Sequence, residues 1–174
     1  MVLVPIPVFT ACSGSLFPFP ADGRERNYYI IGDKNQRESF EDLFDLLDFL
    51  EKKTGNMEER FPVVNKIASE YGRLKEYPRL VNFLGGWMSR YPDDPYSAYY
   101  LLMIAYAYTQ QEADDVAFLY YDLIVKNYPD LTVKGESIHF IALNRLITLA
   151  KNQEQLVWYY EELLSRFSDK TDPG

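Results

Sequence analysis

The sequence predicts an all-α protein, a superhelix of about three helical hairpins with one preceding helix and a flexible N-terminal tether. The first observation is a unit that recurs at a constant offset, since Ala105 and Pro129 follow Ala68 and Pro92 by the same 37 residues. A weaker copy follows 39 residues later, and a period in the range of roughly 20–50 residues is typical of stacked repeats. The second observation is that apolar residues in each unit recur every three or four positions, as on one face of an amphipathic helix.

The composition is that of one folded domain, and it excludes several classes of function. The chain has 174 residues, of which 47% are hydrophobic, and this is long enough for a sizeable core. Its net charge of −8 argues against nucleic-acid binding, which needs clustered Lys and Arg. A single cysteine rules out an internal disulfide, and no apolar stretch reaches the roughly 20 residues of a membrane-spanning helix.

The N-terminal region combines an apolar run with a cysteine and a small polar segment. Residues 1–12 end in Cys12, and this arrangement resembles the end of a bacterial lipoprotein signal, in which the cysteine is acylated. The resemblance implies that residues 1–12 are the remnant of a signal, that Cys12 is the lipidation site, and that the protein reaches a membrane only through this anchor. The other interpretation is a disordered tail with a free thiol. Residues 13–37, with several Gly and Pro, are expected to form the tether.

A helical domain is expected to span residues 38–168, followed by a polar tail over residues 169–174. Its first helix is expected to start near Ser39 and to end at Gly55, a residue type that favours helix C-termini. One apolar face recurs at three- and four-residue spacing through Phe40, Leu43, Phe44, Leu47 and Leu50.

The first two hairpins follow with clear boundaries. The first runs over about 58–92, and its second helix begins at Pro78, whose missing N–H is not needed in a first turn. The segment 91–95 has the composition of a turn. The second hairpin has helices over about 95–110 and 112–127, with acidic residues in the first turn of the latter, where the helix dipole favours them.

The third hairpin is the weakest copy. Residues 130–135 are expected to form a link, followed by helices over 136–151 and 153–167. The positions equivalent to those of the second hairpin, at an offset of 39, are Asn144, Ile147, Leu156, Tyr160, Leu163 and Ser168. A degenerate last unit is typical of a terminal cap in a repeat array.

These landmarks resemble the tetratricopeptide repeat (TPR), a family with a unit of about 34 residues. In the second hairpin the small positions of that unit fall on Ala105 and Ala117, the aromatic positions on Tyr108 and Tyr121, and the terminal proline on Pro129. The resemblance implies that the small residues let the two helices approach and that the tyrosines fill the space between them. Offsets of 37 and 39 residues are longer than the standard unit, so the links between hairpins are expected to be longer.

A narrower resemblance covers about residues 76–150 together with the region of Cys12. The turn 91–97, the segment 104–108 and the helix end 127–129 are similar to those of the BamD-type outer-membrane assembly lipoproteins. That family usually has more repeats than this chain has room for. The resemblance implies outer-membrane assembly components as partners, and a location in the bacterial periplasm or outer membrane through a lipidated Cys12; without the anchor the expectation is cytoplasmic.

No residue pattern predicts catalysis, a cofactor or a metal site. The sole histidine, His139, has no second His or Cys close in sequence, so a structural or solvated role is expected. Asp93 and Asp94 are adjacent in a proline-bounded turn and are expected to form that turn. Phosphate-binding loops and the common hydrolase and metalloprotease motifs do not occur in the chain.

TPR-like geometry instead predicts a partner-binding groove along the first helix of each hairpin. Tyr and Trp are enriched among the residues that contribute most to protein interfaces, and Arg forms bidentate contacts with carboxylates. Two arginines therefore suit a carboxylate or an acidic segment. The predicted groove residues are Asn65, Ser69, Arg73, Tyr99, Leu102, Tyr106 and Arg145, with Gln110, Ile138 and Ile141 at further groove positions.

The sequence thus predicts a non-enzymatic scaffold that binds another protein or a peptide, most concretely in outer-membrane protein assembly. Stacked helical hairpins form extended concave binding surfaces, which favours this interpretation over catalysis. One alternative is a small-ligand-binding partner of an envelope transporter, which requires a closed aromatic pocket rather than an open groove. Another is a soluble TPR adaptor with no lipid anchor.

Overall fold

The computed structural model describes residues 34–53 and 55–168 of the chain. The predicted signal remnant 1–12 with Cys12, most of the tether 13–37 and the tail 169–174 lie outside this range. The end of the predicted tether is wrong, because residues 34–37 belong to the first helix. These four residues are polar and carry no apolar periodicity, so the apolar pattern predicted a helix start about one turn too far along the chain.

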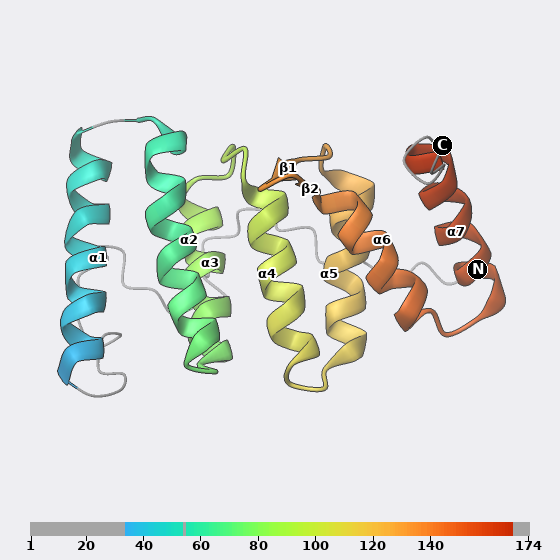
Figure 1. Ribbon diagram of the computed structural model, residues 1–174, viewed down its shortest axis with the longest axis horizontal. Coiled ribbons are helices and arrows are strands. Elements are labelled where there is room, and N and C mark those ends of the chain that lie inside the picture. The colour runs from blue at the N-terminus through green and yellow to red at the C-terminus, as the bar shows by residue number, and fades with distance from the viewer. Residues whose placement is uncertain (1–33, 54, 169–174) are drawn as a thin grey trace.

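The all-α prediction is confirmed. In Figure 1 the helices lie side by side in an elongated array, with α1 at one end and α7 at the other. α2, α4 and α6 form the layer nearer the viewer, and α3 and α5 lie behind them. The helices of the described residues are α1 (Lys34–Lys53), α2 (Met57–Arg73), α3 (Tyr77–Arg90), α4 (Ser97–Thr109), α5 (Asp114–Asn127), α6 (Ile138–Leu149) and α7 (Gln153–Phe167).

Side-chain capping explains where α2, α6 and α7 begin. The Asn56 side chain accepts a hydrogen bond from Glu58 N at 2.9 Å, and the Asn152 side chain accepts one from Gln155 N at 2.9 Å. Each satisfies a backbone donor that the first turn of a helix leaves free. Pro78 lies in the first turn of α3, as the sequence predicted.

Two hydrophobic clusters, which meet at α4, form the core. Ala105 and Ala117 are fully buried, and Tyr121 beside them is only 1% exposed. Small side chains at a helix crossing allow close approach, and the tyrosine fills the remaining volume. Tyr108 is half-buried and stacks on Tyr120 with ring centroids 5.5 Å apart.

The predicted link 130–135 is in fact the first part of a small β-hairpin. Strands β1 (Thr132–Val133) and β2 (Glu136–Ser137) pair antiparallel, and α6 begins directly after β2. The two turn residues, Lys134 and Gly135, have φ of 53° and 84°, the conformation that two-residue hairpin turns require. Lys-Gly is a weaker signal for this turn than Asn-Gly or Asp-Gly, so the pattern predicted only a link.

The register of the third hairpin also differs from the sequence prediction. Tyr159 is 3% exposed, whereas Tyr160, the predicted core tyrosine, is 48% exposed. On α6, Asn144 is exposed while Leu143 before it is fully buried. One residue along a helix rotates the side-chain direction by about 100°. The hairpin absorbs chain length between α5 and α6, so a constant offset cannot carry across it.

His139 is buried and connects α6 to α7, to the end of α5 and to the segment between α5 and β1. Its Nδ1 accepts a hydrogen bond from Arg166 of α7 at 2.6 Å, since a guanidinium only donates. Nε2 therefore carries the ring hydrogen and donates it to the Tyr128 carbonyl at the end of α5, at 2.9 Å. The Asp130 carboxylate accepts from the His139 backbone N at 3.0 Å and from the Ser137 hydroxyl. The role of this histidine is structural.

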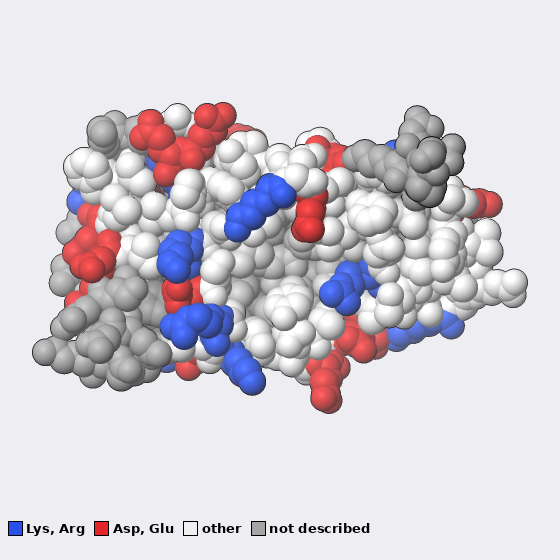
Figure 2. Space-filling view, viewed as in Figure 1, with Lys and Arg blue, Asp and Glu red and all other residues white. Residues whose placement is uncertain are grey.

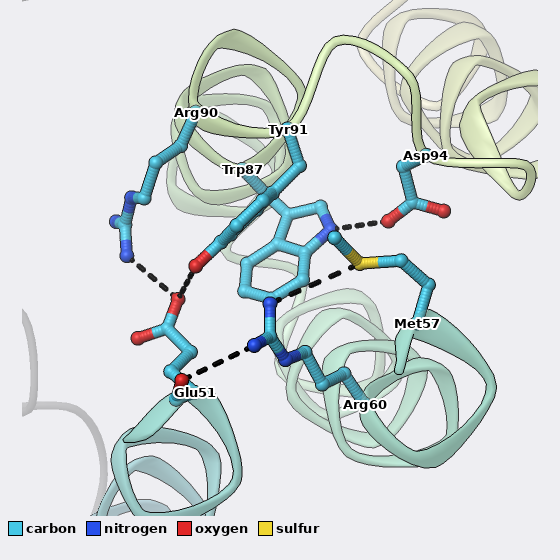
Figure 3. A network of polar contacts seen from close by, with 7 residues as sticks. All are labelled: Glu51, Met57, Arg60, Trp87, Arg90, Tyr91 and Asp94. Atoms are coloured by element: carbon cyan, nitrogen blue, oxygen red, sulfur yellow. Dashed lines mark hydrogen bonds and ion pairs between the residues drawn. The ribbon is translucent and has the colours of Figure 1, made fainter. Parts of the chain in front are cut away.

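A polar network connects α1 to the first hairpin (Figure 3). The Glu51 carboxylate accepts hydrogen bonds from Tyr91 at 2.7 Å and from Arg90 at 2.9 Å. Arg60, which is buried, donates to the Glu51 backbone carbonyl at 3.2 Å and lies 5.1 Å from the centre of the Tyr91 ring. Burial and the adjacent Glu51 carboxylate raise the pKa of Tyr91. The network links the C-terminal end of α1 to α2 and to the end of α3, in addition to the packing of the apolar face of α1 against the core.

The turn before α4 depends on a buried carboxylate. Asp94 is 5% exposed, and its oxygens accept from the indole N–H of Trp87 and from Tyr96 N, both at 2.8 Å. Its backbone carbonyl accepts from the Ser97 hydroxyl at 2.7 Å. Asp94 therefore forms the turn, as expected, and the turn postpones the start of α4 from the predicted Pro95 to Ser97.

Candidate functional site

The main candidate site is a hollow on the face that α2, α4 and α6 share. Its volume is about 490 Å³, and its lining comes from the first helices of all three hairpins, with one residue each from α3 and α5. Figure 2 shows this hollow near the middle of the face, with Lys and Arg side chains on both sides of it. We call this hollow the groove.

The structure brings most of the predicted groove residues together. Ser69, Arg73, Tyr99, Leu102, Tyr106 and Arg145 all line the groove. Asn65 lies next to it, one turn before Ser69, and accepts a hydrogen bond from the Tyr99 hydroxyl at 3.1 Å. Ile141 also lines it.

Two of the further groove positions are wrong. Ile138 is 1% exposed and belongs to the core, because it is the first residue of α6 and packs inward directly after β2. Gln110 is not among the lining residues, because its position lies after the last residue of α4.

The floor of the groove is apolar and holds one fixed tyrosine. The Tyr99 ring packs edge-on against Phe61 with centroids 5.5 Å apart, and its hydroxyl is bound to Asn65. Burial raises the pKa of Tyr99, so its hydroxyl remains a neutral donor over the physiological range. Met103 adds a flexible thioether to the floor. Tyr106, by contrast, is 47% exposed and presents its ring to the solvent.

The charge of the α2 wall is positive. Glu70 accepts from Lys66 at 2.7 Å and from Arg73 at 2.7 Å, and these two cations hold the pKa of Glu70 below its ordinary value. One ionised carboxylate between two cations leaves this wall with one net positive charge. The Arg73 guanidinium has further donors beyond the Nε that Glu70 uses.

The opposite wall carries a guanidinium without a local counter-charge. Arg145 lines the groove from α6 and forms no ion pair with any residue that the structure describes. Together with the α2 wall it makes the groove basic, although the chain as a whole carries a net charge of −8. A groove of this kind attracts anionic groups while the rest of the surface repels them.

Sequence reasoning missed the contribution of the hairpin. In Figure 1 the turn of β1 and β2 lies across the N-terminal end of α4, on the same face as the groove. The turn contains Lys134, a further cation on this face. The pair Lys134-Gly135 between two short segments is the signal in the sequence that could have indicated a hairpin. The signal is weak because each strand has only two residues.

The described residues show no other centre of chemistry. They contain no group of three or more His, Cys, Asp or Glu side chains arranged to hold a metal ion. Nor does any described helix have an apolar stretch long enough to cross a bilayer. In comparisons with protein-family models, curated proteins and solved structures, no match to the chain was found.

Proposed function

We propose that the protein is a non-enzymatic scaffold whose groove binds an acidic segment of another protein. The observation that supports this most directly is the convergence of two arginines and three tyrosines on one basic hollow. Arg and Tyr are the residue types that most often contribute large shares of binding energy at protein interfaces. Arg also pairs with carboxylates through two parallel hydrogen bonds.

The groove suits a rigid mode of recognition. Tyr99 is already fixed by Asn65 and Phe61, so its side chain loses little freedom when a partner binds. Tyr106 and Arg145 are exposed and stay available at the rim, on α4 and α6. A bound segment places an apolar side chain on the floor and its carboxylates between Arg73 and Arg145.

A second candidate function is the binding of a small anionic ligand, because about 490 Å³ lies within the usual range of ligand pockets, roughly 300–1,000 Å³. That function needs an enclosed aromatic pocket. The 47% exposure of Tyr106 favours an open groove, and therefore a segment of a protein.

The finer form of the proposal is a TPR-type scaffold of the bacterial envelope, related in role to the BamD-type assembly lipoproteins and anchored through Cys12. It rests on the sequence resemblance alone. Metabolic labelling with palmitate tests the anchor, with the natural gene expressed in its own cell. We expect label on the wild type and none on Cys12→Ala. The absence of label from both would overturn the anchor and leave the groove proposal untouched.

Affinity capture after crosslinking in the native cell tests the groove. Tyr106→Ala with Arg145→Ala removes one exposed ring and one cation, and neither side chain is buried, so the fold is expected to persist. Leu119→Ala with Lys52→Ala is the matched control, because it also removes one exposed apolar side chain and one cation, away from the groove.

We expect the wild type and the control to capture the same partner, and the groove variant to lose it. Equal capture by all three proteins would overturn the assignment of the groove. Loss of capture by the control alone would place the binding surface elsewhere. If the groove binds a small anion rather than a protein, the wild type and the control will show a thermal shift with that anion at low salt, and the groove variant will not.

A further inference from the structure

A second surface of the protein lies on α7, at the end of the array. Val157, Tyr160 and Leu164 follow one another at spacings of three and four residues, so they form one stripe along the helix. Their exposed fractions are 47%, 48% and 58%, although helix residues at such a spacing usually mark a buried face. We call these three residues the α7 stripe.

The stripe lies where a following helix of a stacked array would pack. In Figure 1 α7 is the last helix of the array. Arrays of this type normally need a terminal unit with a polar outer face to stay soluble. α7 instead keeps three apolar side chains exposed, and Phe140 of α6, 41% exposed, extends this surface by packing edge-on against Phe167.

The charges beside the stripe are acidic. Glu154 lies three residues before Val157, and Glu161 lies three residues before Leu164, so both flank the stripe on one side. Both are exposed, and neither forms an ion pair with a described residue. Other carboxylates are paired: Glu162 of α7 with Arg166 at 2.6 Å, and Asp122 of the neighbouring α5 with Lys126 at 2.8 Å.

We propose that the α7 stripe with Glu154 and Glu161 is a docking surface for a basic amphipathic helix of another protein. An apolar face on that helix covers the stripe, and Lys or Arg beside the face pairs with the two glutamates. The helix-in-groove mode of recognition uses anchors with this spacing. The complementary charges set the orientation and exclude other partners.

The same charges argue against a second copy of this chain as the occupant. An antiparallel pair of α7 helices centred on Tyr160 would bring Glu161 of each copy close to Glu161 of the other. A head-to-tail arrangement would bring α7 against α1, whose exposed side chains include Glu41, Asp42, Asp45 and Asp48. Like charges at either contact cost several kcal/mol.

The experiment uses two synthetic 18-residue helical peptides, both closed by a side-chain lactam so that their helicity is equal. Both carry leucines at the spacing of the stripe, and one is flanked by lysines while the other is flanked by glutamates. Fluorescence anisotropy of the labelled peptides measures binding to the full chain. We expect the lysine peptide to bind at least about tenfold more tightly than the glutamate peptide.

Three variants locate the surface. Val157→Ser with Leu164→Ser is expected to weaken the lysine peptide at least about tenfold. Val116→Ser with Leu119→Ser is the matched control on α5, where both side chains are also exposed, and is expected to leave binding unchanged. Glu154→Lys with Glu161→Lys is expected to reverse the preference, so that the glutamate peptide binds more tightly.

Several results would overturn the proposal. One is binding that survives the serine variant of the stripe, and another is binding that Tyr106→Ala with Arg145→Ala removes, since this would place the peptide in the groove. If Glu154→Lys with Glu161→Lys still prefers the lysine peptide, the two glutamates do not take part in binding. Sedimentation that shows a dimer of the wild type, lost in the serine variant, would make a second copy the occupant instead.

Discussion

The register of the third hairpin can be tested with two neighbouring tyrosines on α7. Tyr159→Ala removes a ring that is 3% exposed, and Tyr160→Ala removes one that is 48% exposed. The repeat pattern of the sequence placed Tyr160 in the core, and the structure places Tyr159 there. The two variants differ by one position along the same helix, so helix propensity and chain composition are matched.

The expected magnitudes follow from the contacts of each ring. Tyr159 packs against Phe118 with centroids 5.9 Å apart, and its hydroxyl donates to Asp122 at 2.7 Å. Truncation of a buried aromatic side chain to Ala costs about 3–5 kcal/mol. Tyr160 is 48% exposed, so its replacement should change the free energy of unfolding by less than about 0.5 kcal/mol.

The assay must report on α7 itself, because a terminal helix of an array can undock before the rest unfolds. Hydrogen exchange of the α7 amides gives this local free energy. A loss of about 3 kcal/mol corresponds to exchange that is faster by about 150-fold, at tenfold for each 1.4 kcal/mol. Tyr159→Phe keeps the ring and removes only the hydroxyl, so it separates the hydrogen bond to Asp122 from the packing, and should cost about 1 kcal/mol.

The reasoning would be refuted if Tyr160→Ala accelerated exchange in α7 as much as Tyr159→Ala. Equal and small effects for both variants would show that neither ring lies in the core. Either result would contradict the burial of Tyr159 and the exposure of Tyr160 that the structure shows.

Three further predictions concern stability. Lys66 and Arg73 hold the pKa of Glu70 below its ordinary value, so the stability that the carboxylate contributes is present above about pH 4.5 and is lost as the pH falls through the folded-state pKa. Urea titrations should therefore find Glu70→Gln less stable than the wild type by roughly 0.5 kcal/mol at neutral pH, with a difference that disappears in acid; a constant difference would contradict the linkage. Lys134→Asn should raise the free energy of unfolding by roughly 0.5 kcal/mol, and with it the melting temperature, because Asn accepts a φ of 53° more readily than Lys. A lower melting temperature would show that Lys134 makes a stabilising contact. Trp87→Phe should cost about 3 kcal/mol in urea titrations, because it leaves a buried carboxylate without its indole donor; a cost below about 1 kcal/mol would exclude that bond as a structural element.

Much of the groove could be predicted from the sequence because α2 and α4 keep one offset. Ser69 and Tyr106 lie 37 residues apart, and the structure places both on the groove. Helix periodicity then carries neighbouring positions, such as Arg73, onto the same face. On α6 the agreement was partial: Arg145 and Ile141 line the groove, but Ile138 is buried.

The features that were missed share a physical cause, since they depend on contacts between residues distant in sequence. Arg60 interacts with the Glu51 backbone carbonyl across a helix boundary, and neither residue belongs to an apolar pattern. His139 receives its role from Arg166, 27 residues later. Periodicity reports which face of a helix is apolar, but it carries no information on which polar groups meet.

The sequence by itself determined the all-α fold class and the order of the helices, because apolar periodicity and turn-forming residues act locally and can be recognised along the chain. It also determined that groove residues of α2 and α4 share a face. Only the tertiary structure decided the rotation of α7 and the position of the basic hairpin turn. Those two depend on how the chain between α5 and α6 folds, and they determine whether Tyr159 or Tyr160 is buried and which apolar side chains the end of the array leaves exposed.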